Sequence, residues 1–465
     1  MIPGTTGASA SPISGLMEDL PTFPVSPYYT FLDDLSTERV YLLETTVKDA
    51  GGTDVDVRLS SHTVTIDGVP YDAHIVNPLN FGISLFQSDR LLGQTKFGAG
   101  TIVLANGDGD LDYLLAGAEW DNKITILVGH KTFERGDYRE IFIGYTEQPT
   151  WDLNKVTLRI RDAQVIFNRQ LQQVLLANAG DATNKPAPTS YGWTVNVSPT
   201  LLESDEVANT YKYKVHYEQV AKITVYFAGI LATEGTDFTV DLANGEFTLL
   251  TNPLGVVTAT VEAQSGYTAS EIIKHIATDE GGLTWPDDFV VSSFDEVNIA
   301  NPTELGLFVA TDDSGMTVSQ AIDWVITSIG GFWGFDRFSR LRIGIIGEPI
   351  NPEKTFTQNE ILNITRKATP INSWRTRLNF RRNWTVFSDN QIAGAAGDSQ
   401  REYLKQQYRT RIAEDPTVQA EHPLAVDFEY DTLMTIRPDA STEAARQQAL
   451  HGEDSRAGCG LFWCW

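Results

Sequence analysis

Alternation of apolar and polar residues dominates the first third of the chain. Between residues 38 and 175, short runs such as HTVTIDGVPYDAHIV and KVTLRIRD place apolar side chains at every second position, and Gly, Asn, Asp and Pro occupy the breaks. This period is typical of antiparallel strands that bury one face. The Asp67-Gly68 pair between two such runs predicts a tight hairpin turn. We therefore expect a β domain over this span.

A longer period appears over residues 318–329, where apolar side chains recur every three or four positions. That spacing predicts an amphipathic helix that lies on another element. Thr317 and Gln320 form the capping-box pattern that starts such a helix. Gly330 and Gly331 follow it, and they predict the left-handed backbone that ends it.

The residues after this glycine pair form the most aromatic stretch of the chain. Two segments, 332–335 and 341–346, flank a charged turn and are expected to pair as a hairpin. The stretch 317–344 is therefore predicted to be a helix-to-hairpin joint. Its structural residues are predicted to be Gly330, Gly331, Trp333, Asp336 and Arg337.

The remaining spans differ in composition. Pro, Gly, Ser and Thr dominate the N-terminal end, whereas hairpin-like patterns return after residue 210. Two further helices are predicted, one from the capping box Thr268 to Glu271 and one polar helix over Ser399 to Ala413. We expect an extended arm at 1–37, the first β domain at 38–175, a linker at 176–210, a small β-sandwich-like insert at 211–264, the helix-plus-hairpin region at 265–350, a second, incomplete β domain at 351–450, and a tail at 451–465.

The net charge of the chain limits which partners it can bind. Its formal net charge is −26, which argues against binding DNA by phosphate neutralisation. An acidic surface along which DNA slides without binding fits this sign, and so does acidity that serves solubility alone. No apolar run is long enough to span a membrane. The start of the chain lacks a signal-peptide pattern, so we expect synthesis in a host cytoplasm.

Metal and cofactor sites are not expected. Asp108, Asp110, Asp112 and Glu119 occupy positions one, three, five and twelve of a calcium loop, but Tyr113 stands where that loop needs glycine. We favour a glycine-rich turn in which Asp110 caps a following helix. The only two cysteines lie in the closing GCGLFWCW and are too few for a structural zinc site.

One cluster in the acidic chain is basic and aromatic. Arg375, Arg377 and Trp384 belong to it, and such residues could bind nucleic acid by stacking and phosphate pairing. Alternation, however, places both arginines on one side of a strand. We favour their pairing with carboxylates of this or another subunit.

Several motifs, taken in order, resemble the tail hub or baseplate proteins of tailed bacteriophages. In the C-terminal half these are IGGFWGFDRFSRLRIG, RRNWTVF, REYLKQQYR and EHPLA, and in the N-terminal half ANGDGDLDYLLAGAEWDNKITILVGH and IFIGYTEQP. The resemblance covers roughly residues 38–450. It implies a mainly β fold with a few short helices (α+β), in which two tail-tube-like β-barrel or sandwich domains carry a small inserted β domain.

The same resemblance implies that the helix-to-hairpin joint at 317–344 is a scaffold for ring assembly, and it implies a function for the whole chain. We expect a structural virion protein at the tail tip, which forms a ring around the DNA channel, contacts distal tail, tube and tip or fibre proteins, and takes part in host attachment and genome ejection. The ring is expected to be a homotrimer, or alternatively a hexamer. Family members commonly continue with further strands after the last helix. Here the apolar GCGLFWCW follows instead, and we expect it to dock on a partner chain.

Three alternatives stay open. The first is a distal tail or tail-tube ring protein, and the second is a tail-associated hydrolase of cell wall or polysaccharide. The third is a carbohydrate-binding module within 211–261. We do not expect an enzyme, because the sequence contains no GxSxG, HExxH or Walker motif.

Overall fold

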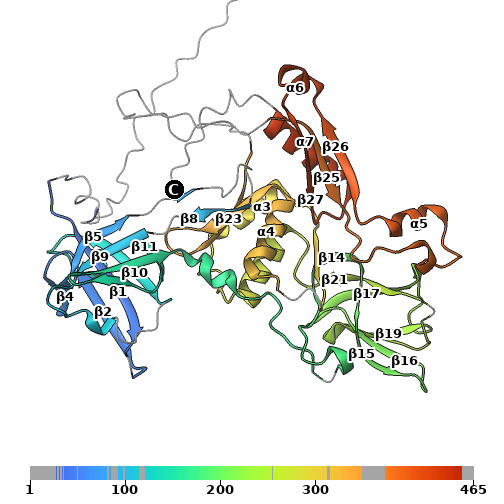
Figure 1. The fold of residues 1–465 in the computed structure, drawn as a ribbon, viewed down its shortest axis with the longest axis horizontal. Helices are drawn as coiled ribbons and strands as arrows, with labels where there is room; N and C mark the ends of the chain where they lie inside the picture. Colours follow the sequence, from blue (N-terminus) through green and yellow to red (C-terminus); the bar gives the residue numbers. More distant parts are fainter. Residues whose placement is uncertain are drawn as a thin grey trace, which may run out of the picture. The chain divides into compact units, whose positions relative to one another are not determined.

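The computed structural model describes residues 28, 31, 34, 36–49, 51–80, 83–84, 93–97, 100–114, 121–177, 179–253, 255–311, 315–347 and 372–452. Most of the predicted arm, Glu119, the start of the second predicted β domain and the tail from residue 453 lie outside these residues. The chain divides into two compact units, whose helices and strands are labelled in Figure 1. Unit 1 comprises Met1–Pro78, Ile102–Ile143 and Gln148–Leu158, and unit 2 comprises Leu79–Thr101, Gly144–Glu147 and Arg159–Trp465.

One ten-stranded sheet, most of whose residues belong to unit 1, has the order β3-β4-β2-β1-β10-β11-β13-β9-β5, and β12 pairs with β13. Its strands are β1 (Val40–Lys48), β2 (Asp54–Ser60), β3 (Val64–Ile66), β4 (Val69–Ala73), β5 (Ile75–Asn80), β9 (Gly100–Ala105), β10 (Lys123–Gly129), β11 (Arg139–Thr146), β12 (Thr150–Asp152) and β13 (Lys155–Arg161). The predicted turn joins β3 to β4, with positive φ at Asp67 and Gly68. Alternate side chains, among them Val40, Leu42 and Leu127, form its apolar core.

Two sheets of unit 2 enclose a second core. The five-stranded sheet has the order β18-β17-β21-β14-β22, and the four-stranded sheet has the order β15-β16-β20-β19. Their strands are β14 (Thr189–Val197), β15 (Thr200–Asp205), β16 (Thr210–Lys214), β17 (Val220–Phe227), β18 (Ile230–Leu231), β19 (Phe238–Asp241), β20 (Glu246–Leu249), β21 (Val257–Ala263) and β22 (Gly306–Val309). Val225, Phe247 and Val261 are buried between these sheets.

The joint was predicted at 317–344 and extends in the structure to residue 345; it lies in the largest apolar cluster among the described residues of unit 2. It consists of α4 (Val318–Ser328), β23 (Gly331–Phe335) and β24 (Leu341–Ile345). β23 lies between β24 and the short strand β7 (Gly93–Gln94). The elements around it are η3 (Ala163–Asn168), α2 (Ala269–His275), the π-helix η6 (Ile276–Glu280) and α3 (Val291–Ala300). Both predicted capping boxes are confirmed, at Thr317 and at Thr268.

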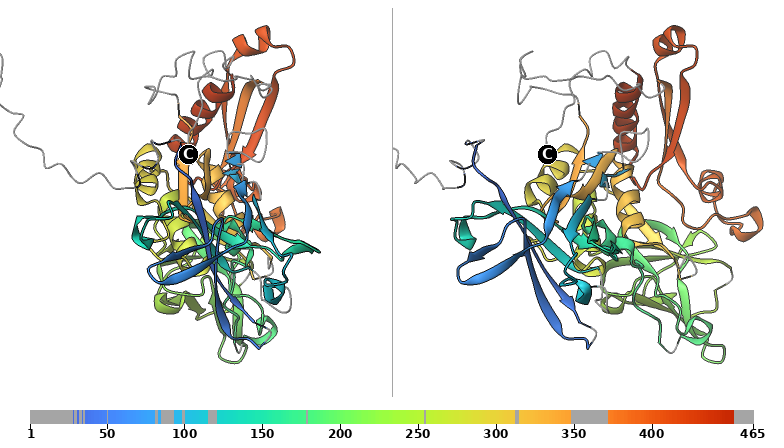
Figure 2. Two further views of the ribbon diagram at one scale, coloured as in Figure 1. Left: turned by 90° about the vertical axis from the view of Figure 1, so that its left-hand side faces the viewer. Right: turned by 60° about the vertical axis from the view of Figure 1, so that its left-hand side comes forward.

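The C-terminal sheet has the order β26-β25-β27. It consists of β25 (Ser373–Phe380), β26 (Arg409–Glu414) and β27 (Val426–Asp431), and β27 runs parallel to β25. Helix α7 (Arg437–Gly452) lies along one face of it (Figure 2), and Thr376 of β25 donates a hydrogen bond to Gln448 of α7. Short helices α5 (Asp398–Lys405) and α6 (Pro416–Glu421) flank β26 in the chain.

The structure confirms the mainly β prediction. It differs from the predictions in that the sheets formed by the described residues do not close into barrels, and in the conformation of two segments. The predicted linker 176–210 contains β14 and β15, and β14 is paired on both sides. The predicted helix Ser399 to Ala413 ends at Lys405, because the next residues pair with β25 as β26. Among the described residues, no helix has the length and apolar character needed to cross a membrane.

Candidate functional site

The two glycines at the end of α4 have different roles. Gly330 adopts a left-handed conformation with φ of 60°, as predicted for a helix C-terminus. Gly331 does not, and β23 begins with it. A Cβ atom on Gly331 would lie 2.7 Å from the carbonyl oxygen of Gly344 and 3.0 Å from Ile326. The need for glycine there comes from close strand and helix packing rather than from backbone conformation.

The aromatic side chains of the joint are buried. Trp333 is fully buried, and its indole nitrogen donates to Asp323 of α4 at 3.3 Å. Phe167 of η3 contacts Trp333 and Phe335, with ring centroids 5.8 and 5.3 Å away. Burial raises the pKa of Asp323, while the hydrogen bond from Trp333 opposes that shift. These rings belong to the core and are not exposed to a ligand.

The hairpin turn depends on Asp336. Its carboxylate accepts from the backbone amides of Phe338 and Arg340, both at 2.9 Å, and from the guanidinium of Arg340 at 2.7 Å. Arg337 lies with its guanidinium 4.7 Å from the centre of the Phe338 ring. One carboxylate therefore accepts hydrogen bonds from turn amides that have no backbone acceptor.

A contact that the sequence did not predict ties α7 to the joint. Arg446 donates to the carbonyl oxygens of Ile329 at 3.0 Å and Ile346 at 2.7 Å. Glu443, almost fully buried, pairs with Arg446 at 2.6 Å. A cation at a helix C-terminus satisfies carbonyls that have no helical partner. Arg446 is 117 positions from Ile329 and 100 from Ile346, so no local sequence pattern predicts this contact.

The predicted arginine cluster lies on the face of β25 opposite α7. Arg375 pairs with Glu414 of β26 at 2.9 Å and with Asp427 of β27 at 3.5 Å. Arg377 pairs with Asp427 at 2.6 Å. Trp384 lies apart from them, in contact with Trp324 and with Arg382, whose guanidinium is 4.2 Å from its ring centre.

A buried polar cluster in unit 2 was also not predicted. Glu280, at the end of the π-helix, is 5% exposed and accepts from the hydroxyls of Tyr217 at 2.6 Å and Tyr191 at 3.4 Å. Burial raises the pKa of Glu280, and these two hydrogen bonds oppose that shift. His216 is buried beside both tyrosine rings, and burial lowers its pKa to about 3. The arrangement satisfies buried polar groups that are separated widely in the chain.

The calcium-loop residues do not surround one point. Asp112 accepts from the side-chain amide of Asn106 at 2.8 Å and begins a short 3-10 helix. Glu119 lies outside the described residues. Asp108 and Asp110 do lie together, and the third side chain beside them is His74, which the sequence did not suggest.

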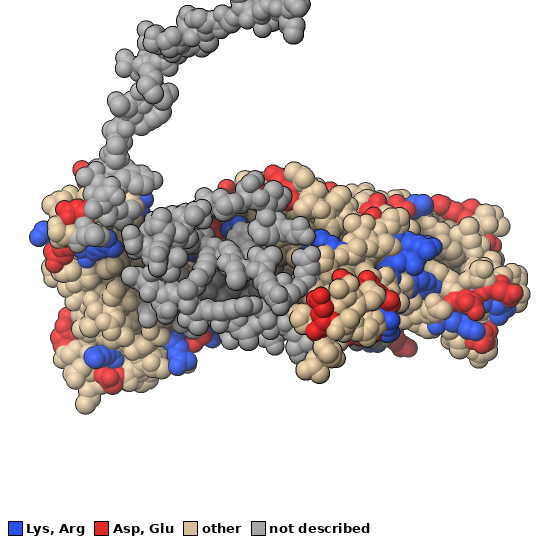
Figure 3. Space-filling view, turned by 90° about the horizontal axis from the view of Figure 1, so that it is seen from above, with Lys and Arg blue, Asp and Glu red and all other residues tan. Residues whose placement is uncertain are grey.

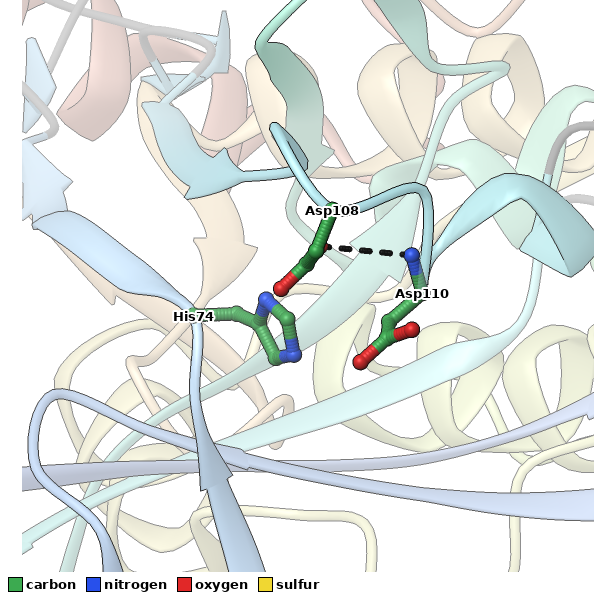
Figure 4. A group of neighbouring side chains, drawn as sticks. All are labelled: His74, Asp108 and Asp110. Carbon is green, nitrogen blue, oxygen red and sulfur yellow. Dashed lines mark hydrogen bonds between the residues drawn. The ribbon is translucent and has the colours of Figure 1, made fainter.

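His74, Asp108 and Asp110 form a set of ligand-type side chains in unit 1 (Figure 4). One nitrogen or oxygen atom from each lies within 4.8 Å of the others. His74 stands between β4 and β5, and the two aspartates follow β9. The imidazole Nδ1 lies 2.8 Å from the carbonyl oxygen of Ala105, and the backbone amide of Ala105 donates to the carbonyl of His74 at 2.7 Å. Strand pairing thus brings distant residues together.

An open pocket of about 550 Å³ adjoins these three side chains and shares Asp108 with them. Trp151 at its edge is 61% exposed. The pocket is lined by Asn106, Gly107, Asp108, Gly109, Asp112, Trp151, Asp152 and Leu153.

Charge is mixed on the surface. Figure 3 shows acidic and basic side chains interspersed over the described part of the face it presents.

Comparison with known proteins identifies no family for this chain. No family model matches the sequence, and no curated protein matches it. Among solved structures, a chain from the virion of a native gene transfer agent particle is similar over 51% of this chain and 84% of that chain, with 12% identity and a TM-score of 0.22. A likeness of that size carries no conclusion about the fold or function of this chain.

Proposed function

We propose that this chain is a structural virion protein of a phage-like particle, and that it acts at the tail tip as a hub. The observation that carries the proposal is the order of motifs along residues 38–450, which resembles tail hub proteins. In this function the chain works by assembly and not by catalysis. It forms a ring around the DNA channel and joins the tail tube to the tip proteins that take part in host attachment and genome ejection.

The C-terminal sheet supports the assembly part of this proposal. Among the described residues, β26 and β27 each pair only with β25, so each leaves an open edge. Open edges present unpaired N–H and C=O groups and accept a strand from another chain. Strands supplied by neighbouring copies would extend this sheet toward the tube-like barrel expected from the resemblance.

The charged face of the same sheet favours a specific neighbour. Arginine and carboxylate side chains alternate across the three strands, and Ile412 of β26 is 54% exposed among them. Complementary charges at an interface fix its register and discriminate between partners. The net negative charge of the chain suits a channel through which DNA passes without binding.

The mass of the assembled particle tests the proposal. We expect the purified chain to form a ring with the mass of three copies of 51.4 kDa, measured by native mass spectrometry. Six copies would favour a distal tail or tube ring, and a monomer at all concentrations would contradict assembly. A tag on the chain, imaged in purified virions, should label the tail tip, and labelling elsewhere would contradict the hub role.

A pair of variants tests the interface. Ile412→Lys adds charge to the C-terminal sheet, whereas Leu424→Lys adds the same charge at a residue that is 88% exposed and outside the sheet. Both side chains are exposed, so neither change should affect folding. We expect Ile412→Lys alone to weaken the ring. Equal effects of the two variants would place the interface elsewhere.

The hydrolase alternative has its own test. Purified chain is incubated with cell walls or surface polysaccharide, and soluble sugar or peptide is measured. Release that is lost in Glu280→Gln would support catalysis by the buried carboxylate, whose raised pKa is a property of general acids.

A further inference from the structure

The side chains of His74, Asp108 and Asp110 have the composition of a transition-metal site. Imidazole nitrogen and carboxylate oxygen together suit first-row divalent ions, whereas calcium prefers ligands that are all oxygen. The three side chains come from two separate segments of unit 1, so folding and not sequence proximity gathers them.

The hydrogen bond of His74 determines which nitrogen is available. A carbonyl oxygen only accepts, so Nδ1, at 2.8 Å from the oxygen of Ala105, carries the proton. In the neutral ring the lone pair is then on Nε2, which can bind a cation. Metal-binding histidines are usually held in this way, by donation of the other nitrogen to a backbone carbonyl or a carboxylate.

The charges of Asp108 and Asp110 also favour a bound cation. Asp108 and Asp110 form no ion pair with any other residue that the structure describes. Asp108 accepts one backbone bond, from the amide of Asp110 at 3.3 Å, and this bond leaves carboxylate oxygen available. Two neighbouring carboxylates without a basic partner repel each other, and a divalent cation between them would cancel both charges.

We infer that His74, Asp108 and Asp110 bind one divalent transition-metal ion such as Mn²⁺. Ligand atoms around one such ion lie about 3–4 Å apart, so small side-chain rotations close a set that already lies within 4.8 Å. Three protein ligands leave further coordination positions for water or for oxygen atoms of a ligand in the adjoining pocket, which Asp108 also lines. The ion would tie the loop after β9 to the β4–β5 connection.

Mn²⁺ binding to the full chain tests this inference. After treatment with EDTA and its removal, free Mn²⁺ is measured by electron paramagnetic resonance during titration. We expect one saturable site, at least tenfold weaker binding in His74→Gln and in Asp110→Asn, and at least tenfold weaker competition by Ca²⁺. Mn²⁺ should raise the thermal midpoint of the wild type and not those of the two variants, because a ligand stabilises only the state that binds it.

Two matched variants serve as controls. His62→Gln and Asp54→Asn remove the same chemical groups from other parts of unit 1 and should leave Mn²⁺ binding unchanged. Circular dichroism and thermal midpoints in EDTA establish that all four variants fold. Absence of a saturable site in the wild type at millimolar Mn²⁺, or full binding by His74→Gln and Asp110→Asn, would overturn the inference.

Discussion

The joint and the C-terminal sheet of unit 2 are built from similar residues, aromatic side chains interleaved with arginines and acids, but they use them differently. In the joint every residue of β23 is buried, and Trp333 lies in the largest apolar cluster. In the C-terminal sheet, Arg375 and Arg377 are on an open face, and their carboxylate partners are partly exposed. Packing therefore dominates the joint, whereas exposed charge pairs, each worth little to stability, dominate the sheet.

The largest expected effect comes from overpacking the joint. Gly331→Val adds atoms where a Cβ alone would lie 2.7 Å from the oxygen of Gly344. Because that oxygen belongs to the backbone of the paired strand, it cannot move without breaking the hairpin. We expect loss of folded unit 2, and with it of ring formation, measured by circular dichroism and size-exclusion chromatography.

Gly394→Val is the matched control for this change. A Cβ atom at Gly394 would meet no atom within 4 Å. This variant should fold and assemble like the wild type. A Gly331→Val protein that assembled normally would mean that the joint tolerates loose packing and that the contrast with the sheet is overstated.

A smaller effect is expected from the buried carboxyl group that caps η3. Asp162 is 8% exposed, and its Oδ1 accepts from the amide of Gln164. Burial raises its pKa to about 7 from 3.8. Between those values the unfolded chain loses the proton while the folded chain keeps it, so stability falls as pH rises from about 4 to about 7. At about 1.4 kcal/mol per unit, the loss is at most roughly 4 kcal/mol.

Asp162→Asn should remove this pH dependence and keep the capping acceptor. We expect its thermal midpoint to match the wild type near pH 4 and to exceed it near pH 8. Asp295→Asn, at an exposed position of α3, is the control and should leave the profile unchanged. If Asp162→Asn were less stable than the wild type at pH 8, the ionised carboxylate would be stabilising, contrary to burial as the dominant cause.

The smallest effect is expected on the C-terminal sheet. Arg377→Ala removes a pair whose side chains are 37% and 31% exposed, and such pairs contribute about 0–1 kcal/mol. Urea unfolding of the ring-free chain should barely change, while the proposed assembly weakens. A stability loss above about 2 kcal/mol would show that this sheet depends on its charges as the joint depends on its packing.

Sequence patterns predicted the elements whose signals are local. The capping boxes at Thr317 and Thr268, the turn at Asp67 and the hairpin of the joint all depend on residues a few positions apart. The sequence pattern predicts helix beyond Lys405, whereas the structure has strand β26 there, because its conformation comes from pairing with β25. The sequence pattern does not predict strand β14 for a similar reason. Its conformation depends on pairing with β21 on one side and with β22 on the other.

Local sequence patterns are enough to establish a mainly β chain, the place of its principal helix and hairpin, and the strong negative charge, because periodicity, capping and composition act over short distances. Three other features emerge only in the folded chain: Gly331 is needed for close packing, Arg446 donates to a carbonyl oxygen at the C-terminal end of α4, and His74 lies beside Asp108 and Asp110. Each of these depends on atoms that are far apart in the chain, and burial and strand register, which no local pattern encodes, bring them together.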